Sequence, residues 1–239
     1  IPCYAADKEF ALRPNAFMDY AQEIAYLAAT ELGFGYDALN EHHTAWVLSR
    51  MSMDFIKMPK WRDTVYLDTW HKGIDGLFFM RDFQMRDKDS DEIIVAASSS
   101  WLVIDSETRR LVRGDEVQRR FLMQAQCTEN ALPENAPKLV MPKDIEKEHV
   151  KDHLVCYSDV DFIGHTNNVR YIVWSLDCIP NEITFGRPVK HININFNKET
   201  VEGQIITINR VCIEEGDSLR YMIEGVVDGK AAFVSEIIF

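Results

Sequence analysis

Residues 157–174, YSDVDFIGHTNNVRYIVW, concentrate polar side chains of the types that enzymes use for catalysis. Asp161 and His165 lie four residues apart, and Gly164 directly precedes the histidine. A carboxylate and an imidazole can transfer protons near neutral pH, and glycine allows a sharp turn or the close approach of a ligand. The same residue types also form ordinary turns and helix caps. The stretch therefore indicates either acyl-transfer chemistry or a structural turn, and the residues alone favour neither.

The segment that follows, residues 169–176, contains no Gly or Pro and predicts a short helix. Asn167 or Asn168 is the expected N-cap. The free N–H groups and the positive end of the helix dipole would then face His165. A helix that starts here is able to stabilise negative charge on a reacting group.

The composition is that of a globular protein with a large core. The chain has 239 residues, of which 46% are hydrophobic and 27% charged. This is enough for one large domain or two domains of ordinary size. No apolar run reaches the length of a membrane span. Because the sequence begins with Ile1 rather than Met, we expect that an upstream segment was removed or left out.

The cysteines and the net charge limit the cellular compartments and the classes of partner that fit this sequence. The five cysteines are widely spaced and form no C-x-x-C pair, which predicts reduced thiols in a cytosol-like compartment and no metal site. A net charge of −12 argues against nucleic acid or an anionic membrane as a partner. Residues 109–120 are the local exception, either a solvated face or a docking patch for an acidic partner. The arginines of this cluster are Arg109, Arg110, Arg113, Arg119 and Arg120.

The first half of the chain predicts one helix followed by an antiparallel sheet. Apolar residues recur at helical spacing over residues 15–32, with Asn15 as the expected N-cap and Gly33 at the end. From Ala45 the apolar period changes to two, as in a half-buried strand. A helix followed by such strands forms an α+β unit. The strand candidates are residues 45–55, 64–70, 77–85 and 93–104.

The second half repeats the first after a proline-containing linker, residues 125–151. A shift of 141 residues places Met51 and Met53 on Ile192 and Ile194. Apolar and polar phases then agree over about seventeen positions. Further strand candidates in this half are residues 204–212, 219–227 and 231–239. We therefore expect one fold used twice, over residues 8–124 and 152–239, with the reactive groups only in the second copy.

This order of elements resembles a tandem, or double, hotdog fold, in which each half is a helix wrapped by an antiparallel sheet. The string SDVDFIGHTNNVRYIVW, with Glu199 and Thr200 at the end of a later strand, is similar to acyl-ACP thioesterases of the bacterial and plant plastid type. The resemblance covers nearly the whole chain. It implies hydrolysis of fatty acyl-ACP to a free fatty acid, which ends chain elongation. It also implies no cofactor and a location in the cytoplasm, or in the plastid stroma of a plant.

The resemblance further implies that Asp161, His165 and Glu199 are the catalytic residues. Asp161 would act as general base or as nucleophile, and the sequence does not separate these roles. Glu199 would share or polarise the attacking water, and His165 would orient the carboxylates or the thioester. The oxyanion hole would consist of N–H groups at the helix start, those of Thr166, Asn167 and Asn168.

Two positions depart from the family pattern. The family has an asparagine where this chain has Ile163, whose side chain neither donates nor accepts a hydrogen bond. Many plant members have a cysteine directly after the glutamate, where this chain has Thr200. A cysteine nucleophile at that position is therefore excluded. At Ile163, either another group holds what the family's asparagine orients, or the activity is reduced, and Ile163 is also the best argument for a non-catalytic acyl-binding module.

The family places the acyl pocket mainly in the first half. The candidates there are Phe17, Tyr20, Met51, Met53 and Phe55, although each alone is more commonly a core residue. Because the carrier is acidic like this chain, the arginine cluster is the expected docking patch. A homodimer and an acyl-CoA rather than acyl-ACP substrate stay open.

Overall fold

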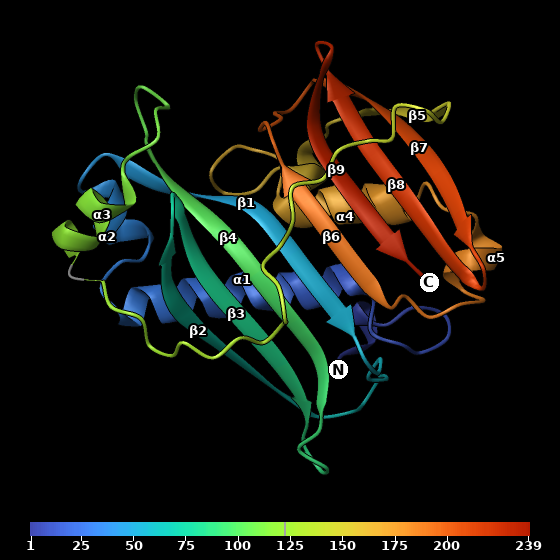
Figure 1. The fold of residues 1–239 in the computed structure, drawn as a ribbon, viewed down its shortest axis with the longest axis horizontal. Helices are drawn as coiled ribbons and strands as arrows, with labels where there is room; N and C mark the ends of the chain where they lie inside the picture. Colours follow the sequence, from blue (N-terminus) through green and yellow to red (C-terminus); the bar gives the residue numbers. More distant parts are fainter. Residues whose placement is uncertain (122) are drawn as a thin grey trace.

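The computed structural model describes residues 1–121 and 123–239. Its N-terminal half packs one long helix, α1 (Pro14–Glu31), against antiparallel strands (Figure 1). Arg13 is the N-cap of α1, and Pro14 occupies the first helical position, where its missing N–H leaves no helical hydrogen bond unmade. The prediction that Asn15 caps this helix was therefore wrong. The other elements of this half are η1 (Cys3–Ala5), α2 (Tyr36–Asn40), β1 (Thr44–Phe55), β2 (Val65–Asp75), β3 (Phe78–Asp87), β4 (Ile93–Asp105) and α3 (Gly114–Phe121).

The C-terminal half repeats this arrangement around a shorter helix, α4 (Asn168–Leu176). Asn167 is its N-cap, as expected, and the side-chain oxygen accepts the N–H of Val169 at 2.9 Å. β5 (Glu148–Leu154) begins inside the segment that was predicted to be a linker. It is a short, mostly exposed edge strand with little apolar alternation, so the pattern did not reveal it. The remaining elements are η2 (Tyr157–Asp159), α5 (Asn181–Thr184), β6 (His191–Phe196), β7 (Ile205–Glu215), β8 (Ser218–Val227) and β9 (Lys230–Ile238).

The strands form one continuous antiparallel sheet in the order β2-β3-β4-β1-β6-β9-β8-β7-β5. β1 and β6 join the two halves, and Ser52 lies directly opposite Asn193. The 141-residue shift maps Ser52 onto Asn193, so equivalent residues of the two copies pair across this junction. Such pairing is what a local twofold axis between two copies of one fold produces.

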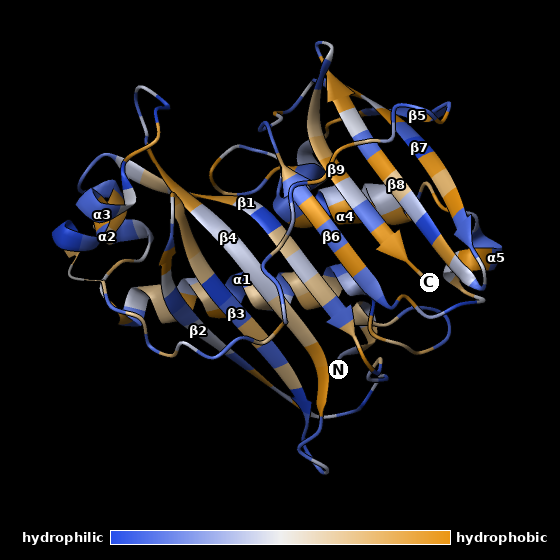
Figure 2. Cartoon of the chain, in the orientation of Figure 1, coloured by the Kyte–Doolittle hydropathy of each residue, from blue (hydrophilic) through white to orange (hydrophobic). Residues whose placement is uncertain are grey.

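Both central helices, α1 and α4, lie on the same face of the sheet (Figure 1). Strand residues alternate between this face and the other, and Figure 2 shows the alternation of hydropathy along β6 and β8. Met53 of β1, Ile192 and Ile194 of β6, and Phe233 of β9 are all fully buried. They belong to one hydrophobic core that continues through both halves.

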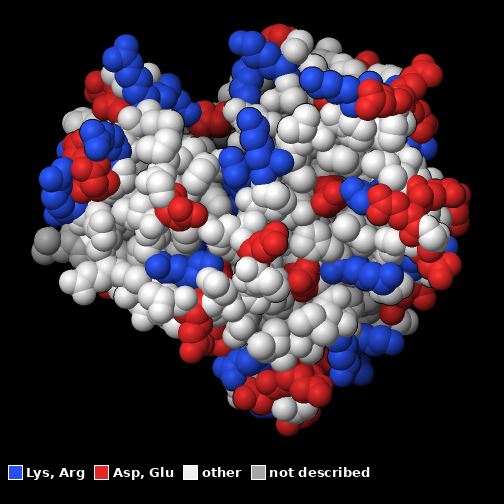
Figure 3. Space-filling model, in the orientation of Figure 1, with Lys and Arg blue, Asp and Glu red and all other residues white. Residues whose placement is uncertain are grey.

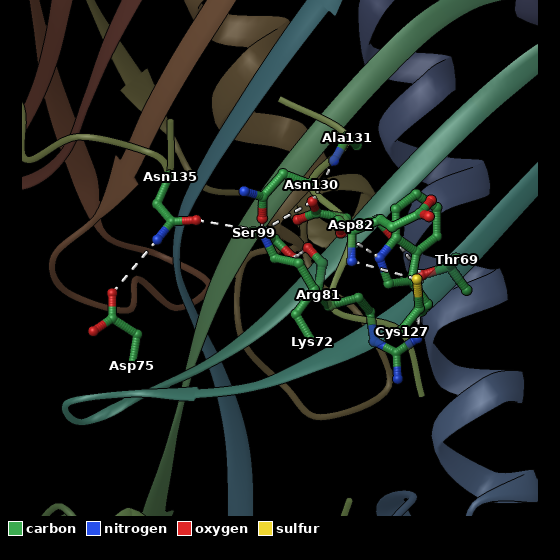
Figure 4. A network of polar contacts seen from close by, with 12 residues as sticks. Thr69, Lys72, Asp75, Arg81, Asp82, Ser99, Cys127, Asn130, Ala131 and Asn135 are labelled. Carbon is green, nitrogen blue, oxygen red and sulfur yellow. Dashed lines mark hydrogen bonds and ion pairs between the residues drawn. The ribbon is translucent and has the colours of Figure 1, made fainter. Parts of the chain in front are cut away.

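The segment between the halves crosses the opposite face of the sheet (Figure 1). On β6, the side-chain oxygen of Asn195 accepts the N–H of Leu139 at 2.7 Å. On β3, the fully buried Asp82 accepts the N–H of Ala131 at 2.7 Å and pairs with Lys72 at 3.0 Å (Figure 4). These polar contacts attach the connecting segment to both halves of the sheet.

Candidate active site

The turn before α4 is closed by its own backbone. Gly164 has a φ of +87°, which glycine adopts without strain. Its N–H donates to the carbonyl oxygen of Asp161 at 3.0 Å, and the N–H of Asp161 donates to the carbonyl oxygen of His165 at 2.9 Å. The Asp161 carboxylate accepts the N–H of Ile163 at 3.0 Å. Asp161 and His165 are therefore held at the two ends of one compact turn.

Asp159 anchors this turn, although the predicted site did not include it. Its carboxylate accepts the N–H of Cys156 and the Nε–H of Arg170, each at 3.0 Å, and lies 2.9 Å from Nε2 of His153. Burial raises the pKa of Asp159, but these hydrogen bonds outweigh burial and lower that pKa below its usual value. The carbonyl oxygen of Asp159 accepts the N–H of Asn167 at 2.8 Å. A buried carboxylate thus ties the turn to the start of α4.

Glu199, in the loop after β6, meets His165 near the start of α4. Nε2 of His165 lies 3.6 Å from Oε2 of Glu199, and the side chains are 32% and 35% exposed. The residues that follow them are joined, because the N–H of Thr166 donates to the carbonyl oxygen of Thr200 at 2.8 Å. The Thr200 hydroxyl also donates to Oγ1 of Thr166 at 2.7 Å and lies 2.8 Å from the Tyr171 hydroxyl. This buried link fixes the approach of the imidazole to the carboxylate.

Asp161 stands slightly apart from the other two predicted catalytic side chains. The contact that the structure shows for its carboxylate is with the N–H of Ile163, within its own turn. Its backbone is nevertheless bonded to that of His165, which contacts Glu199. The structure therefore joins His165 and Glu199 directly and brings Asp161 beside them through the main chain.

The start of α4 offers fewer free donors than the sequence predicted. The N–H of Thr166 is bonded to the carbonyl oxygen of Thr200, and the N–H of Asn167 to that of Asp159. Both N–H groups are thus already bonded within the protein, and Thr166 and Asn167 would have to release these bonds to serve as the predicted oxyanion hole. The N–H of Asn168 donates to none of the residues that the structure describes. It is the remaining candidate at this helix start.

At Ile163, where the family has asparagine, the side chain of the nearby Asn167 does not take the place of the missing amide. Ile163 is 51% exposed. Asn167, the nearest candidate in sequence, uses its side-chain oxygen to cap α4 and to accept a hydrogen bond from Nε2 of Gln22 at 3.3 Å. Asn167 is thus a structural residue that also connects α4 with α1.

Arg109 reaches this site from the N-terminal half. It lies in the loop after β4, 90 residues before Glu199, and its Nη2 contacts Oε2 of that carboxylate. Arg109 was predicted to lie in a docking patch for the carrier, whereas in the structure its side chain contacts a predicted catalytic residue. No local pattern in the sequence indicates such a distant contact.

The other four arginines of the cluster, Arg110, Arg113, Arg119 and Arg120, are exposed in or before α3. Arg110, Arg113 and Arg120 line a surface cavity of about 500 Å³. Positive and negative groups lie side by side at this end of the molecule (Figure 3). Three arginines pair with acidic residues of α3: Arg113 with Asp115 at 3.2 Å, Arg119 with Asp115 at 3.3 Å and Arg120 with Glu116 at 2.7 Å. Their positive charge is therefore partly neutralised within the helix.

The predicted acyl-pocket residues fill the core of the N-terminal half. Phe17, Met51, Met53 and Phe55 are buried, and Tyr20 is partly buried against the same core. The rings of Phe17 and Phe55 meet edge to face, with centroids 6.0 Å apart. The Tyr20 hydroxyl is buried and has no hydrogen-bond partner in the described part of the chain. In this conformation the five side chains pack against the core and one another.

Residues 1–121 and 123–239 contain neither a group of metal-ligating side chains nor a helix that could span a membrane. No three His, Cys, Asp or Glu side chains in these ranges are grouped as ligands for a metal ion. No helix there is long and apolar enough to cross a membrane.

Comparisons with known proteins agree with the geometry of both halves. The family profile "Acyl-ACP thioesterase N-terminal domain" matches residues 1–120, and the "Acyl-ACP thioesterase C-terminal domain" matches residues 142–238. The chain belongs to the acyl-ACP thioesterase family. The family resemblance read from residues 158–174, Glu199 and Thr200 is confirmed.

Two named relatives of this acyl-ACP thioesterase family member are plant proteins. An oleoyl-acyl carrier protein thioesterase 2 of Arabidopsis thaliana, described as chloroplastic, is 30% identical over 200 residues, which cover 77% of this chain and 54% of the relative. A chloroplastic palmitoyl-acyl carrier protein thioesterase of Gossypium hirsutum is 31% identical over 198 residues, covering 77% of this chain and 47% of the relative. The chain thus spans about half the length of these relatives.

Solved structures match over the full length of the chain. An acyl-ACP thioesterase from Bacteroides thetaiotaomicron superimposes with a TM-score of 0.83 at 26% identity, covering 100% of this chain and 94% of the other. The 12:0-ACP thioesterase from Umbellularia californica superimposes with a TM-score of 0.85 at 20% identity, covering 99% and 93%. The predicted α+β double hotdog fold is confirmed.

Proposed function

We propose that this protein hydrolyses the thioester of a fatty acyl chain carried on acyl carrier protein and releases the free fatty acid and the carrier. The observation that carries the proposal is the contact between His165 and Glu199 beside the start of α4. The Arabidopsis and Gossypium relatives, named for oleoyl and palmitoyl carrier substrates, support this substrate class. We also propose that the protein acts in the cytoplasm or, in a plant, in the plastid stroma. The chloroplastic descriptions of both relatives support the second location.

The reaction adds water to the thioester carbonyl and breaks the carbon–sulfur bond, so that the carrier thiol leaves with a proton. Glu199 polarises the attacking water, and His165 orients the carboxylates or the thioester. Asp161 acts as general base or as nucleophile, and both roles fit its place beside His165. The Asn168 N–H and the positive end of α4 stabilise the oxyanion that forms on the carbonyl oxygen.

The two halves have different roles in the proposed reaction. Residues 8–124 form the acyl-binding half, residues 125–151 the connection, and residues 152–239 the catalytic half. Met51 and Met53 of the first half occupy the positions of Ile192 and Ile194 in the second. Methionine is flexible and repacks more readily than β-branched isoleucine. This difference supports an acyl chain that enters between Met51, Met53 and the aromatic rings of the first half.

The carrier docks on the exposed arginines around α3. The net charge of the chain is −12, so an acidic carrier is repelled at long range unless it meets a local basic surface. Arg110, Arg113, Arg119 and Arg120 supply that surface, although pairing with Asp115 and Glu116 weakens it. A homodimer, which the sequence left open, would be detected by light scattering.

The test is release of free fatty acids from a mixed acyl-ACP pool, followed by mass spectrometry. Glu199→Ala and Asp161→Ala are each expected to lower the rate about 100-fold or more, because each removes a group that handles the attacking water. Glu202→Ala, which removes an exposed carboxylate three residues away, is the matched control and keeps the wild-type rate.

Full activity in both catalytic variants contradicts the assignment. A higher wild-type rate on acyl-CoA than on acyl-ACP favours the acyl-CoA alternative. Tight acyl binding without turnover favours a non-catalytic binding module, for which Ile163 is the structural argument.

A further inference from the structure

The loop after β4 and the loop after β6 belong to different halves of the chain, but they lie close together where these two strands end. Figure 1 shows both at the upper edge of the view, and Figure 3 shows a recess between the two halves at the same edge. Arg109 in the first loop contacts Oε2 of Glu199 in the second. His165 approaches the same oxygen at 3.6 Å. Among the described residues, Oε1 of Glu199 accepts no hydrogen bond.

The loop that carries Arg109 is held firmly by Asp105. The Asp105 carboxylate accepts the N–H of Thr108 at 2.7 Å and the N–H of Glu107 at 3.1 Å. The carbonyl oxygen of Asp105 accepts the N–H of Arg109 at 2.9 Å, and the N–H of Asp105 donates to the carbonyl oxygen of Arg110 at 2.8 Å. A turn with this many internal bonds presents the Arg109 side chain from a defined backbone position.

Arg109 has a φ of +60°, a left-handed conformation that costs free energy for any residue with a Cβ. Glycine would relieve this cost, yet the chain has arginine here. The pair that it forms is 46% and 35% exposed, and ion pairs of such exposure add little to stability. Stability therefore does not account for an arginine at this position, whereas strained residues often lie at functional sites.

We propose that Arg109 is a positioning residue for Glu199, supplied to the catalytic half by the N-terminal half. A guanidinium holds a carboxylate in a fixed orientation better than a point charge does. With Oε2 held by Arg109 and approached by His165, Oε1 is the oxygen that faces the attacking water. The inference rests on the proposed hydrolysis and assigns Arg109 to it rather than to carrier docking.

The experiment compares Arg109→Gly, Arg109→Lys and Arg86→Gly with the wild type on two substrates, acyl-ACP and a soluble acyl-N-acetylcysteamine thioester that has no carrier. Glycine suits the left-handed backbone, so Arg109→Gly removes the side chain without straining the loop. Arg86, which pairs with Asp68 at 2.8 Å, is an arginine of the same half away from the site and serves as the control. Thermal unfolding of each variant is measured in parallel.

We expect Arg109→Gly to lower kcat about 10-fold or more on both substrates, since a small misplacement of a catalytic group is costly. KM for the small thioester stays unchanged. The unfolding temperature of Arg109→Gly stays unchanged or rises. Arg109→Lys recovers part of the kcat, and Arg86→Gly keeps the wild-type kcat. Wild-type turnover of acyl-ACP in the same assay establishes the proposed function independently.

Three results overturn the inference while leaving the proposed function intact. The first is an unchanged kcat of Arg109→Gly on the small thioester. The second is a loss confined to KM for acyl-ACP, which makes Arg109 a docking residue. The third is a loss of kcat that matches a loss of folded protein, which makes its role structural.

Discussion

Glu199 is contacted by charged or polar side chains from both halves of the chain. His165 approaches it from its own half, and Arg109 contacts it from the other. An exposed ion pair contributes roughly 0–1 kcal/mol to stability, and the left-handed φ of Arg109 costs about 1–2 kcal/mol. The ion pair therefore does not offset the cost of the backbone conformation. The contact is therefore better explained by the geometry that it gives to Glu199 than by the stability of the fold.

A single substitution tests whether the hydroxyl of Thr200 holds the site together. Thr200→Val keeps the shape of the side chain and the backbone bond to Thr166, but it leaves the Thr166 and Tyr171 hydroxyls without their partner. Unpartnered buried polar groups cost about 1–3 kcal/mol. Urea unfolding should show a loss of this size, and kcat should fall because the link between His165 and Glu199 loosens.

The control for this substitution is Thr64→Val, at an exposed threonine before β2. It is expected to stay within about 0.5 kcal/mol of the wild type. If Thr200→Val also stays within that range, the buried hydroxyl chain does not hold the site together.

Among the elements of the N-terminal half, β2, β3 and the loop between α1 and α2 meet around a buried histidine. His71 of β2 is 3% exposed, and its ring packs against Phe34 and Phe79 at centroid distances of 5.7 and 6.3 Å. Burial, aided by the charge of Arg81 and opposed by a hydrogen bond to the backbone of Met80, lowers the pKa of His71 to about 4. The histidine is thus neutral in the folded protein at neutral pH.

This shift predicts how stability depends on pH. The unfolded chain binds a proton at His71 near pH 6.5, while the folded chain resists it down to about pH 4. Stability is therefore full above about pH 6.5 and falls as the pH drops from there towards 4, by on the order of 3 kcal/mol. Urea unfolding between pH 4 and 7 should show a flatter profile for His71→Phe, which keeps an aromatic ring between Phe34 and Phe79.

His43→Gln, at an exposed histidine, should keep the wild-type slope over the same pH range. A wild-type slope in His71→Phe would mean that groups other than His71 dominate the acid response between pH 4 and 7. The pKa of Asp159 is lowered in the folded state, so its contribution is lost only as the pH falls further, through that lowered pKa.

The elements most visible in the sequence are those whose burial follows a regular period. The predicted ranges of α1, α4 and seven strands were close to the observed ones, although β3 and β4 are buried over long runs rather than at alternate residues. β5 and the short α2, α3 and α5 carry little apolar pattern and were missed. In the site, His165 and Glu199 were found through the family motif. The contact of Arg109 with Glu199 and the burial of Asp159 depend on packing between distant segments, which no local pattern records.

At the scale of the whole molecule, the junction between β1 and β6 makes the two halves interdependent. Met51 lies opposite Ile194, and Met53 lies opposite Ile192, all within one core. Either half alone would expose an unpaired strand edge, which is an aggregation hazard. The C-terminal half alone would also lose Arg109 from the surroundings of Glu199.

These dependencies predict the behaviour of the chain when it is cut between its halves. Residues 1–141 and 142–239, produced separately, should be insoluble or aggregated because each exposes one edge of the junction. Produced together, they should co-purify and hydrolyse acyl-ACP, since the β1–β6 pairing and the contact of Arg109 with Glu199 re-form across the cut. Size-exclusion chromatography and the fatty-acid release assay measure both results, with the uncut chain as reference. A soluble, monomeric and fully active 142–239 fragment would show instead that the catalytic half needs neither the shared sheet nor the arginine of its partner half.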